Sequence, residues 1–587
     1  MNLTINNKPI TAEAGQTILA VARANGFKIP TLCDHPDLEI KANCRICVVE
    51  VKGRPRLVTA CSTLAEAGME ILTSSARVKK ARNLNLELLF GEHTKKCSDC
   101  TLLYNCELLN LAKEYKVNPN RFLNRKSRRP TYRFANAVEI DGSQCIDCQN
   151  CVEACHELQH IDYLKMVGTG IGQEVVPVIN KKKACIYCGQ CTLHCPVAAA
   201  QEQPAWDEVA KALKDKNRVV VAQFAPAIRV SLGEEFGLPY GQNVEGKCYT
   251  ALRKLGFKYV FDINFGADIT TMVEAEELLA RLKDKQAVFP MTTSCCPGWV
   301  AYAEFYHPEL LPHLTTARSP QIHLAGAIKT YWAAKKGINP KKIVVVSIVP
   351  CTAKKYEAAR PELALNGRPL VDYVLTTREF AYLIKKHKID FKNLRDGQGE
   401  SLFNTGSGAA AIYGASGGVM ESALRTANAL ICARSKKTAC ENHLEFKEVR
   451  GLAGFKEATV NLDGRKIRVG VVNGIGHINK VLPQLKKYHY IEVMACPGGC
   501  LGGGGQPIPT TRAIRQKRLE GLYNIDASRP QRRAHENKAM LEYYDWVKKN
   551  GLRAKVLETK FKPTSSSILK TVNPPKNASL SLLPAGR

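Results

Sequence analysis

Two cysteines stand side by side in the segment TSCCPGWV, where Cys295 and Cys296 precede a proline and a glycine. Neighbouring side chains tend to point apart, so these two thiols are poor disulfide partners for each other. Two further segments, VPCTAKKYE and VMACPGGCLGGGGQP, also place cysteines in turns rich in proline and glycine. Cys296, Cys351, Cys496 and Cys500 thus offer four thiolates, enough to bind one [4Fe–4S] cluster. Cys295 is left for a different task.

Fifteen of the 23 cysteines precede residue 200, and their tight spacing is typical of metal ligands rather than disulfides. The motifs CIDCQNCVEACHE and CIYCGQCTLHCPVAA share the spacing C-x2-C-x2-C-x3-C. This duplicate is the signature of bacterial ferredoxins with two [4Fe–4S] clusters, in which the fourth cysteine of each motif binds the other cluster. The crossed spacing disfavours a zinc ribbon. It predicts two ligand sets, namely Cys145, Cys148, Cys151 and Cys195, and Cys185, Cys188, Cys191 and Cys155.

A block nearer the N-terminus, CDHPDLEIKANCRICVVEVKGRPRLVTAC, carries Cys33, Cys44, Cys47 and Cys61. Three of these cysteines lie in a loop that leads into the alternating strand CVVEVKG. The block resembles a [2Fe–2S] ferredoxin with a β-grasp fold, although its spacing differs from the plant-type C-x4-C-x2-C. A zinc site is the alternative, but structural zinc sites usually combine two compact CxxC-type turns. We therefore expect one [2Fe–2S] cluster here.

The next block, GEHTKKCSDCTLLYNC, has the spacing H-x3-C-x2-C-x5-C, from His93 through Cys97 and Cys100 to Cys106. One imidazole and three thiolates complete a tetrahedral site, which zinc and a [4Fe–4S] cluster both accept. The neighbouring cluster motifs favour [4Fe–4S]. Replacing one thiolate by a neutral histidine removes a negative charge, so this cluster should have a raised reduction potential.

The 587 residues exceed what one hydrophobic core usually serves, so the chain should form several domains. No apolar run reaches the roughly 18 residues of a membrane span. The first residues lack the pattern of a signal peptide, and the CxxC spacings favour a reducing compartment, so we expect a cytoplasmic location. Thiolate-ligated clusters would offset part of the formal charge of +30. The sequence has no nucleic-acid-binding signature, which favours an acidic redox partner over nucleic acid.

From about residue 215 the pattern changes to buried-strand runs such as NRVVVAQFAP and KKIVVVSIVPC, which alternate with helical stretches such as EAEELLARLKDK. This alternation predicts an α/β region with largely parallel sheets. The whole chain should be a multidomain α+β and α/β protein. We expect five parts: a [2Fe–2S] β-grasp domain over 1–78, a small His/Cys3 cluster domain over 79–125, a two-[4Fe–4S] ferredoxin-like domain over 136–205, a catalytic domain over 215–545, and a flexible tail over 546–587.

The segments TSCCPGWV, VPCTAKKYE and VMACPGGCLGGGGQP resemble the signatures of [FeFe]-hydrogenases, and the four upstream blocks occur in the same order in large members of that family. The resemblance spans residue 1 to about 545. It implies an H-cluster, in which a [4Fe–4S] cluster is joined through Cys500 to a two-iron unit carrying CO, cyanide and a bridging dithiolate. Cys296, Cys351 and Cys496 match the other cluster ligands. The implied reaction is the reversible reduction of protons to H₂.

The same resemblance implies roles for single residues around the H-cluster. Cys295 matches the proton donor beside the dithiolate, and a thiol can relay a proton when its partners lie within hydrogen-bond reach. Lys354 matches a lysine that contacts a cyanide. Other positions that line the pocket are matched by Pro226, Gln321 and Met494.

A proton path is implied by four further matches: Glu274, Thr315, Glu277 and Arg281. Glu274 and Glu277 are three residues apart in a predicted helix and therefore share one face. By themselves, two such glutamates more often mark a solvated helix face. The resemblance places Thr315 between them and Arg281 at the surface end. The family usually has serine at the position of Thr315, so the hydroxyl is retained.

Some positions depart from the family pattern. Val349 stands where many members have methionine, and Ala227 where some have serine, which alters packing or a hydrogen bond at the two-iron unit but not the reaction class. Cys248, Cys432 and Cys440 match no ligand position, and we expect them to be small buried hydrophobic residues.

Three other functions compete with hydrogenase activity. Iron–sulfur assembly factors resemble the family without hydrogen chemistry, but they are not expected to keep Cys295, Glu274, Glu277, Lys354 and the complete CPGGCLGGGGQP loop. A hydrogen sensor would carry an added signalling domain. An electron-transfer subunit like that of NADH dehydrogenase would lack the three distal motifs. The chain has no convincing nicotinamide or flavin site, so we expect ferredoxin or an NAD(P)H-oxidising flavin subunit as electron partner, with H₂ and protons as substrates.

Overall fold

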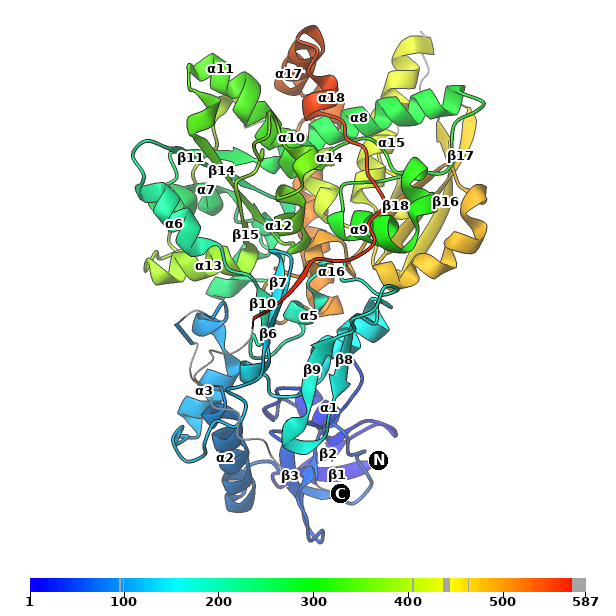
Figure 1. The fold of residues 1–587 in the computed structure, drawn as a ribbon. Helices are drawn as coiled ribbons and strands as arrows, with labels where there is room; N and C mark the ends of the chain where they lie inside the picture. Colours follow the sequence, from blue (N-terminus) through cyan, green and yellow to red (C-terminus); the bar gives the residue numbers. More distant parts are fainter. Residues whose placement is uncertain (94–96, 99, 404–405, 436–443, 463, 573–587) are drawn as a thin grey trace.

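The computed structural model describes residues 1–93, 97–98, 100–403, 406–435, 444–462 and 464–572. The N-terminal sheet contains five short strands in the order β2-β1-β5-β3-β4 (Figure 1). Helix α1 (Ile18–Ala24) packs its apolar residues onto this sheet, because Ile18 and Val21 share one core with Ile5 and Val49. The strands are β1 (Asn2–Ile5), β2 (Lys8–Thr11), β3 (Val48–Val51), β4 (Val58–Thr59) and β5 (Glu70–Leu72).

Helices α2 (Ala76–Gly91) and α3 (Glu107–Glu114) pack against each other and precede a second sheet. This sheet is antiparallel, with the order β10-β7-β6-β19. Between β7 and β10 the chain forms a hairpin and two short helices. Each of the two helices begins inside a C-x2-C-x2-C-x3-C motif. The elements are β6 (Thr131–Phe134), β7 (Val138–Asp141), α4 (Asn150–Glu153), β8 (Leu164–Val167), β9 (Glu174–Pro177), α5 (Gln190–Leu193), β10 (Ala200–Glu202) and β19 (Leu569–Val572).

Two four-stranded sheets form the large region after residue 215. The first has the order β12-β11-β14-β15 and is parallel throughout, and the second has the order β13-β18-β17-β16 with one antiparallel pair, β16 with β17. The prediction of an α/β region with largely parallel sheets is confirmed. The strands are β11 (Val219–Phe224), β12 (Tyr259–Asp262), β13 (Met291–Thr292), β14 (Ile343–Val349), β15 (Tyr373–Thr376), β16 (Phe455–Leu462), β17 (Arg465–Asn473) and β18 (Tyr490–Met494).

Helix α8 (Ile263–Lys283) packs against α10 (Pro320–Ala327) and α15 (Gly418–Ser435) at the end of the molecule opposite the N-terminus (Figure 1). Its first three turns are buried on all sides, although they include the polar residues Asn264, Asp268 and Thr271. Glu274 is one of its buried residues. A buried carboxyl group is costly unless it is hydrogen-bonded or protonated, so this position calls for a functional explanation.

The expectation of a flexible tail over 546–587 is wrong for residues 546–572. The proposed boundary falls inside α17 (Lys538–Lys549), and α18 (Arg553–Val556) follows with Val556 and Leu557 fully buried. The chain then runs along α9 (Pro297–Tyr306) and adds β19 to the edge of β6 (Figure 1). Two apolar residues and one edge strand anchor this segment despite its lysine-, serine- and proline-rich composition. Residues 573–587 lie outside the described part.

Three cysteines were expected to be small buried hydrophobic residues. Cys248 is fully buried, as predicted. Cys432 is partly exposed, so the prediction is wrong there, because the last turns of α15 leave the core. Cys440 lies outside the described residues.

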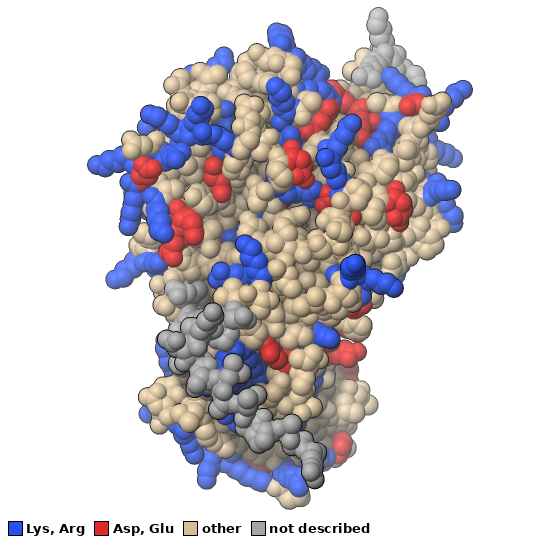
Figure 2. Space-filling model, viewed as in Figure 1, with Lys and Arg blue, Asp and Glu red and all other residues tan. Residues whose placement is uncertain are grey.

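In the described part of the chain, no helix combines the length and the apolar character needed to cross a membrane. Lys and Arg outnumber Asp and Glu on the face shown in Figure 2, in keeping with the formal charge of +30. These basic side chains are spread over the upper and the lower part of that face rather than gathered along one groove.

Candidate metal-cluster sites

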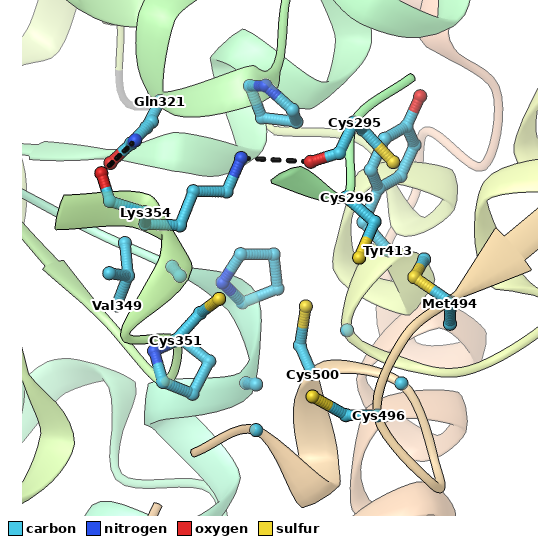
Figure 3. Close-up of a pocket in the computed structure, with 18 of the residues that line it drawn as sticks. Cys295, Cys296, Gln321, Val349, Cys351, Lys354, Tyr413, Met494, Cys496 and Cys500 are labelled. Carbon is cyan, nitrogen blue, oxygen red and sulfur yellow. Dashed lines mark hydrogen bonds between the residues drawn. The ribbon is translucent and has the colours of Figure 1, made fainter. Parts of the chain in front are cut away.

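Four cysteines from three distant loops meet around one cavity. Cys351 follows β14, Cys296 follows β13, and Cys496 and Cys500 follow β18. β13 and β18 are neighbouring parallel strands, so their carboxyl ends and the loops that follow lie at the same edge of the second sheet, whereas β14 brings Cys351 to the cavity from the first sheet. The four sulfur atoms face a common space (Figure 3). The structure therefore brings together the four thiols that the sequence predicted as one ligand set.

The cavity fits an iron cluster bound by thiolates. It has a volume of about 80 Å³, and its lining is almost wholly apolar. Burial raises the pKa of Cys351 to about 12, and it also raises the pKa of Cys496 and of Cys500. Buried thiolates need a strong positive partner, and iron supplies one. A cavity of this width is also larger than one tetrahedral ion requires.

Lys354 and Gln321 supply the polar groups at this cavity. Lys354 lies on α12 (Ala353–Ala358), and its Nζ donates hydrogen bonds to the carbonyl oxygen of Cys295 and to Glu357 Oε2, each at 2.9 Å. Gln321 Nε2 donates to the same Glu357 Oε2 at 2.7 Å, while Gln321 Oε1 has no hydrogen-bond partner among the described residues. Glu357 was not predicted, although its position three residues after Lys354 in a helix was a usable signal.

The remaining predicted pocket residues also line the cavity. Pro226 follows β11 and Met494 ends β18, and both line the cavity together with Val349 and Ala227, the two departures from the family pattern. Figure 3 shows Val349 and Met494 on opposite sides of the space between the sulfur atoms. Tyr413 is a further lining residue that the sequence did not single out. Its hydroxyl group lies 2.8 Å from Thr271 Oγ1, which holds the ring against the cavity.

The outer half of the predicted proton path is continuous. Glu277 Oε2 accepts a hydrogen bond from Thr315 Oγ1 at 2.7 Å, and Glu277 Oε1 accepts one from Arg281 Nη2 at 2.6 Å. Arg281 is partly exposed and donates further bonds to backbone oxygens of the loop before β13. These three side chains therefore form a chain of hydrogen bonds that leads from the protein surface toward the buried part of α8.

The inner half of the path has gaps. Glu274 Oε2 accepts a hydrogen bond from Tyr490 at 2.9 Å, whereas Glu274 Oε1 has no partner among the described residues. Burial raises the pKa of Glu274 to about 8, and the bond from Tyr490 opposes this rise. Burial raises the pKa of Cys295, and the negative charge of Glu274 raises it further. The two groups therefore interact electrostatically without a direct hydrogen bond. Thr315 bonds to Glu277 and does not, within the described residues, bond to Glu274.

The two ferredoxin motifs form two separate cavities. One cavity is lined by the first three cysteines of the first motif and the last of the second, and the other by the reverse combination. The left-handed conformation of Gln149 and Gly189 starts helices α4 and α5 inside the motifs and turns the cysteines inward. The structure thus groups the thiols in the crossed manner that the spacing predicts. The two groups are Cys145, Cys148, Cys151 and Cys195, and Cys155, Cys185, Cys188 and Cys191.

His93, Cys97 and Cys100 line a third cavity. His93 Nδ1 lies 2.7 Å from the carbonyl oxygen of Gln144, so Nδ1 carries the proton and Nε2 is left with a lone pair for a metal. Cys106 does not line this cavity, but its charge adds to the pKa of Cys100, which burial raises to about 12.

The first block forms a compact buried group. Cys47 and Cys61 belong to the N-terminal core, where their Sγ atoms lie 3.4 Å apart, and Cys33 and Cys44 belong to the adjoining core that contains the ferredoxin-type cysteines. All of them are buried, with exposed fractions of at most 6%: Cys33, Cys44, Cys47 and Cys61.

These sites follow one another toward the large cavity. Asn43 Nδ2 donates a hydrogen bond to the carbonyl oxygen of Asp147 at 3.5 Å, and Cys33 and Cys44 share a buried core with Cys148, so the first-block site lies beside the site of Cys148. Thr101 Oγ1 donates to Gln201 Oε1 at 3.4 Å, and Cys100 packs against the core that contains Cys195, a member of the same site. Two sites therefore adjoin one ferredoxin-type site, which produces a branch.

The second ferredoxin-type site meets the large cavity through contacts with the backbone. Cys496 Sγ lies 3.9 Å from the carbonyl oxygen of Cys188. A Cβ atom at Gly504 would lie 2.5 Å from that oxygen and equally close to Gly189 Cα, so only glycine permits this approach. The glycine-rich loop after Cys500 is thus required for contact between the second ferredoxin-type site and the large cavity.

Comparison with known proteins agrees with this architecture. The family described as "Iron only hydrogenase large subunit, C-terminal domain" matches residues 218–504, a 2Fe-2S iron-sulfur cluster binding domain matches 1–76, and an iron hydrogenase small subunit matches 512–564. The NADP-reducing hydrogenase subunit HndD of Solidesulfovibrio fructosivorans is 40% identical, covering 93% of this chain and 95% of its own length. Iron hydrogenase 1 of Clostridium pasteurianum is also 40% identical, covering 92% of this chain and 96% of its own length.

A solved structure supports the same relationship for the large region. The [FeFe]-hydrogenase HydA1 from Chlamydomonas reinhardtii, in a variant form, superposes with a TM-score of 0.54 and 36% identity, covering 62% of this chain and 99% of that one. This chain belongs to the iron-only hydrogenase, or [FeFe]-hydrogenase, family.

Proposed function

We propose that this chain catalyses the reversible reaction 2H⁺ + 2e⁻ ⇌ H₂ at an H-cluster bound by Cys296, Cys351, Cys496 and Cys500. The observation that carries the proposal is the convergence of these four thiols, with the Cys295 thiol beside them, around one apolar cavity. When bound, the H-cluster supplies the metal chemistry that joins protons and electrons. The protein binds it, excludes water and delivers both reactants.

The residues around the cavity have distinct tasks in this proposal. Cys500 is the thiolate shared with the two-iron unit. Lys354 has three N–H groups and uses two of them on protein acceptors, so the third can donate to a cyanide ligand. Gln321, Pro226 and Met494 shape the wall and keep water out.

We infer that protons reach Cys295 through Arg281, Glu277, Thr315 and Glu274. The hydrogen bonds from Arg281 and Thr315 to Glu277 support the outer part. In the inner part, Glu274 Oε1 has no hydrogen-bond partner among the described residues, which leaves it available to a water molecule. A pKa of about 8 suits Glu274 to accept and release protons near neutral pH.

Electrons enter through four accessory clusters in this proposal. One [2Fe–2S] cluster in a β-grasp domain and one [4Fe–4S] cluster on His93 and three cysteines would both pass electrons to the Cys145 cluster. From there electrons would move to the Cys155 cluster and then to the H-cluster. The closeness of Cys188 to Cys496 supports the last step.

The partner is proposed to be an NAD(P)H-oxidising flavin subunit, with ferredoxin as the alternative. One relative that covers nearly the whole chain is named as a subunit of an NADP-reducing hydrogenase, which favours the former. The cytoplasmic location stays a prediction. An assembly factor or a sensor without turnover is disfavoured, because the full-length relatives are hydrogenases and Cys295, Glu274 and Lys354 are all present at the cavity or path.

The test is to produce the chain anaerobically with the cofactor assembled and to record infrared spectra and H₂ evolution with a strong reductant. We expect bands from iron-bound CO and cyanide together with H₂ production. Fully loaded protein without these bands and without H₂ would overturn the proposal. Measured iron should far exceed zinc, since zinc in stoichiometric amount would contradict the accessory clusters.

A further inference from the structure

A second cavity lies at the opposite end of the first parallel sheet from the cysteines. Its volume is about 510 Å³. It is bounded by the residues that precede β11 and β14, by the helical turn η9 (Ile328–Trp332), by the turn at 365–368 and by α18. Strands β11 and β14 start at this cavity and end at the cysteine cavity. A ligand here would therefore not compete with the cofactor for space.

The charge in this second cavity is strongly one-sided. Of the described residues that line it, five are cationic and one is acidic: Arg218, Lys329, Lys341, Arg368, Lys555 and Asp372. The acidic group is already used, because Asp372 Oδ2 accepts hydrogen bonds from Lys329 Nζ at 2.7 Å and from the backbone N–H of Val345 at 2.8 Å. Four cationic side chains remain in excess.

These excess charges lack local compensation. In the part of the chain that the structure describes, Lys341, Arg368 and Lys555 have no ion-pair partner, and Arg218 has one distant partner, Asp215, at 3.6 Å. Lys329 is 9% exposed and lies against the cavity floor. Burial lowers the pKa of Lys329, Asp372 partly offsets this shift, and the charge of Arg368 adds a smaller lowering effect. Like charges gathered in a concave site repel one another and favour the binding of an anion.

The rest of the lining is apolar or neutral. Ile343 and Leu370 are buried in the wall, and Leu365 and Leu552 are partly exposed at the rim. A cavity of several hundred Å³ with an apolar wall and a few converging charges is typical of sites for small organic ligands. Arg218, Lys341, Arg368 and Lys555 are exposed, so their charged groups stand at the open side of this cavity, whereas Lys329 is buried.

We propose that this cavity binds a phosphorylated small molecule of nucleotide size. Its phosphate groups would accept charge-assisted hydrogen bonds from Lys341, Arg368 and Lys555. Its organic part would pack on Ile343 and Leu370. The inference does not depend on the hydrogenase assignment, because none of these residues belongs to the cysteine cavity or to the proton path.

The test is calorimetric titration of the anaerobic holoenzyme with ADP, pyrophosphate and adenosine at about 0.15 M salt, which screens weak surface attraction. We expect saturable binding of ADP and pyrophosphate, and much weaker binding of adenosine. The double variant R368S/K555S should bind ADP at least about tenfold more weakly, because the loss of even one charge-assisted hydrogen bond lowers affinity by about that factor. The matched control K79S/K80S loses the same charge elsewhere and should bind ADP as the wild type does.

Two results would overturn the proposal. One is the absence of saturable binding of both ADP and pyrophosphate to the wild type. The other is equal weakening in the R368S/K555S variant and in the K79S/K80S control, which would show attraction to the charge of the whole protein. H₂ evolution and the visible absorption of the clusters should be unchanged in both variants, so that a folding defect is recognised separately.

Discussion

The hydroxyl group of Tyr490 lies 2.9 Å from Glu274 Oε2 and donates a hydrogen bond to it, although the two residues are 216 positions apart in the chain. Tyr490 begins β18, the strand that leads to Cys496, and Glu274 lies in the buried part of α8. The bond holds one oxygen of the carboxyl group and leaves the other without a protein partner among the described residues. The second oxygen of Glu274 is thereby free to exchange a proton with the Cys295 part or the Glu277 part of the proposed path.

Replacing Glu274 by glutamine should stop proton delivery while preserving the cofactor. An amide retains the shape of the side chain but does not carry a proton back and forth. We expect H₂ evolution to fall by about 10² to 10⁴, the range for loss of a positioned acid–base group. Glu276→Gln is the matched control, because Glu276 lies on the same helix and bonds to Tyr544 and Arg553 outside the path. If Glu274→Gln evolved H₂ as fast as Glu276→Gln, Glu274 would be excluded from proton transfer.

Replacing Tyr490 by phenylalanine should shift the pH dependence of catalysis. The bond from Tyr490 stabilises the ionised carboxylate and lowers the pKa of Glu274, so its loss should raise that pKa above about 8. The limb of the pH–rate profile that follows the ionisation of Glu274 should then move to higher pH. Tyr488→Phe is the control, since it removes a similar bond, to Glu457, on the same sheet. A profile that moves equally in both variants would refute the assignment.

The protonation of Glu274 also predicts how stability depends on pH. Its pKa in the folded protein, about 8, lies above its ordinary value of 4.5, so between these values the folded state binds more protons than the unfolded state. The free energy of unfolding should therefore decrease as pH rises through this window, by at most about 1.4 kcal/mol per pH unit from this group. Glu274→Gln removes the effect, so the variant should gain thermal stability relative to the wild type between pH 5 and pH 8. A constant difference in Tm across that range would contradict the raised pKa.

Replacing Cys295 by serine should reduce H₂ turnover by about 10² or more with the cofactor fully loaded, because a hydroxyl group is a far weaker acid than a thiol. The infrared bands of the bound cofactor should persist, since Cys295 is not proposed as a ligand. Cys248→Ser is the control: this cysteine is fully buried in the core and away from the cavity. Near wild-type turnover by Cys295→Ser would remove the proposed role.

Replacing His93 by cysteine should keep a [4Fe–4S] cluster but lower its reduction potential. A thiolate adds the negative charge that a neutral imidazole lacks, and this charge stabilises the oxidised cluster. Redox titration followed by electron paramagnetic resonance would measure the change. The other cluster signals should stay in place, because His93 lines a cavity separate from theirs. An unchanged potential, or zinc in place of iron at this site, would contradict the assignment.

Local spacing explains why much of the molecule was predictable. In each ferredoxin motif three ligands lie within seven residues, so helix and turn geometry alone brings Cys145, Cys148 and Cys151 together. The parallel sheets were predictable because strands buried on both faces, such as β14, read as continuous apolar runs. The three cavity loops were recognisable because glycine and proline around Cys296, Cys351 and Cys500 mark places where backbone approaches a bulky group.

Other features depended on contacts between distant segments. Tyr490 and Tyr413 acquire their positions at the path or cavity from packing, and nothing in their immediate sequence separates them from ordinary core residues. The ordered C-terminal segment was missed because composition does not show that Val556 finds a buried site or that β19 finds a free strand edge.

By itself, the sequence determined which residue types and spacings are present, and with them the cluster motifs, the fold class and the family resemblance, because these depend on neighbours in the chain. The tertiary structure alone decided that Glu274 is buried and bonded to Tyr490, that Thr315 bonds to Glu277, and that five cationic side chains share one cavity. Burial, pKa and electrostatic excess arise from groups that are far apart in the chain but close in space, and a linear pattern carries no distance between them.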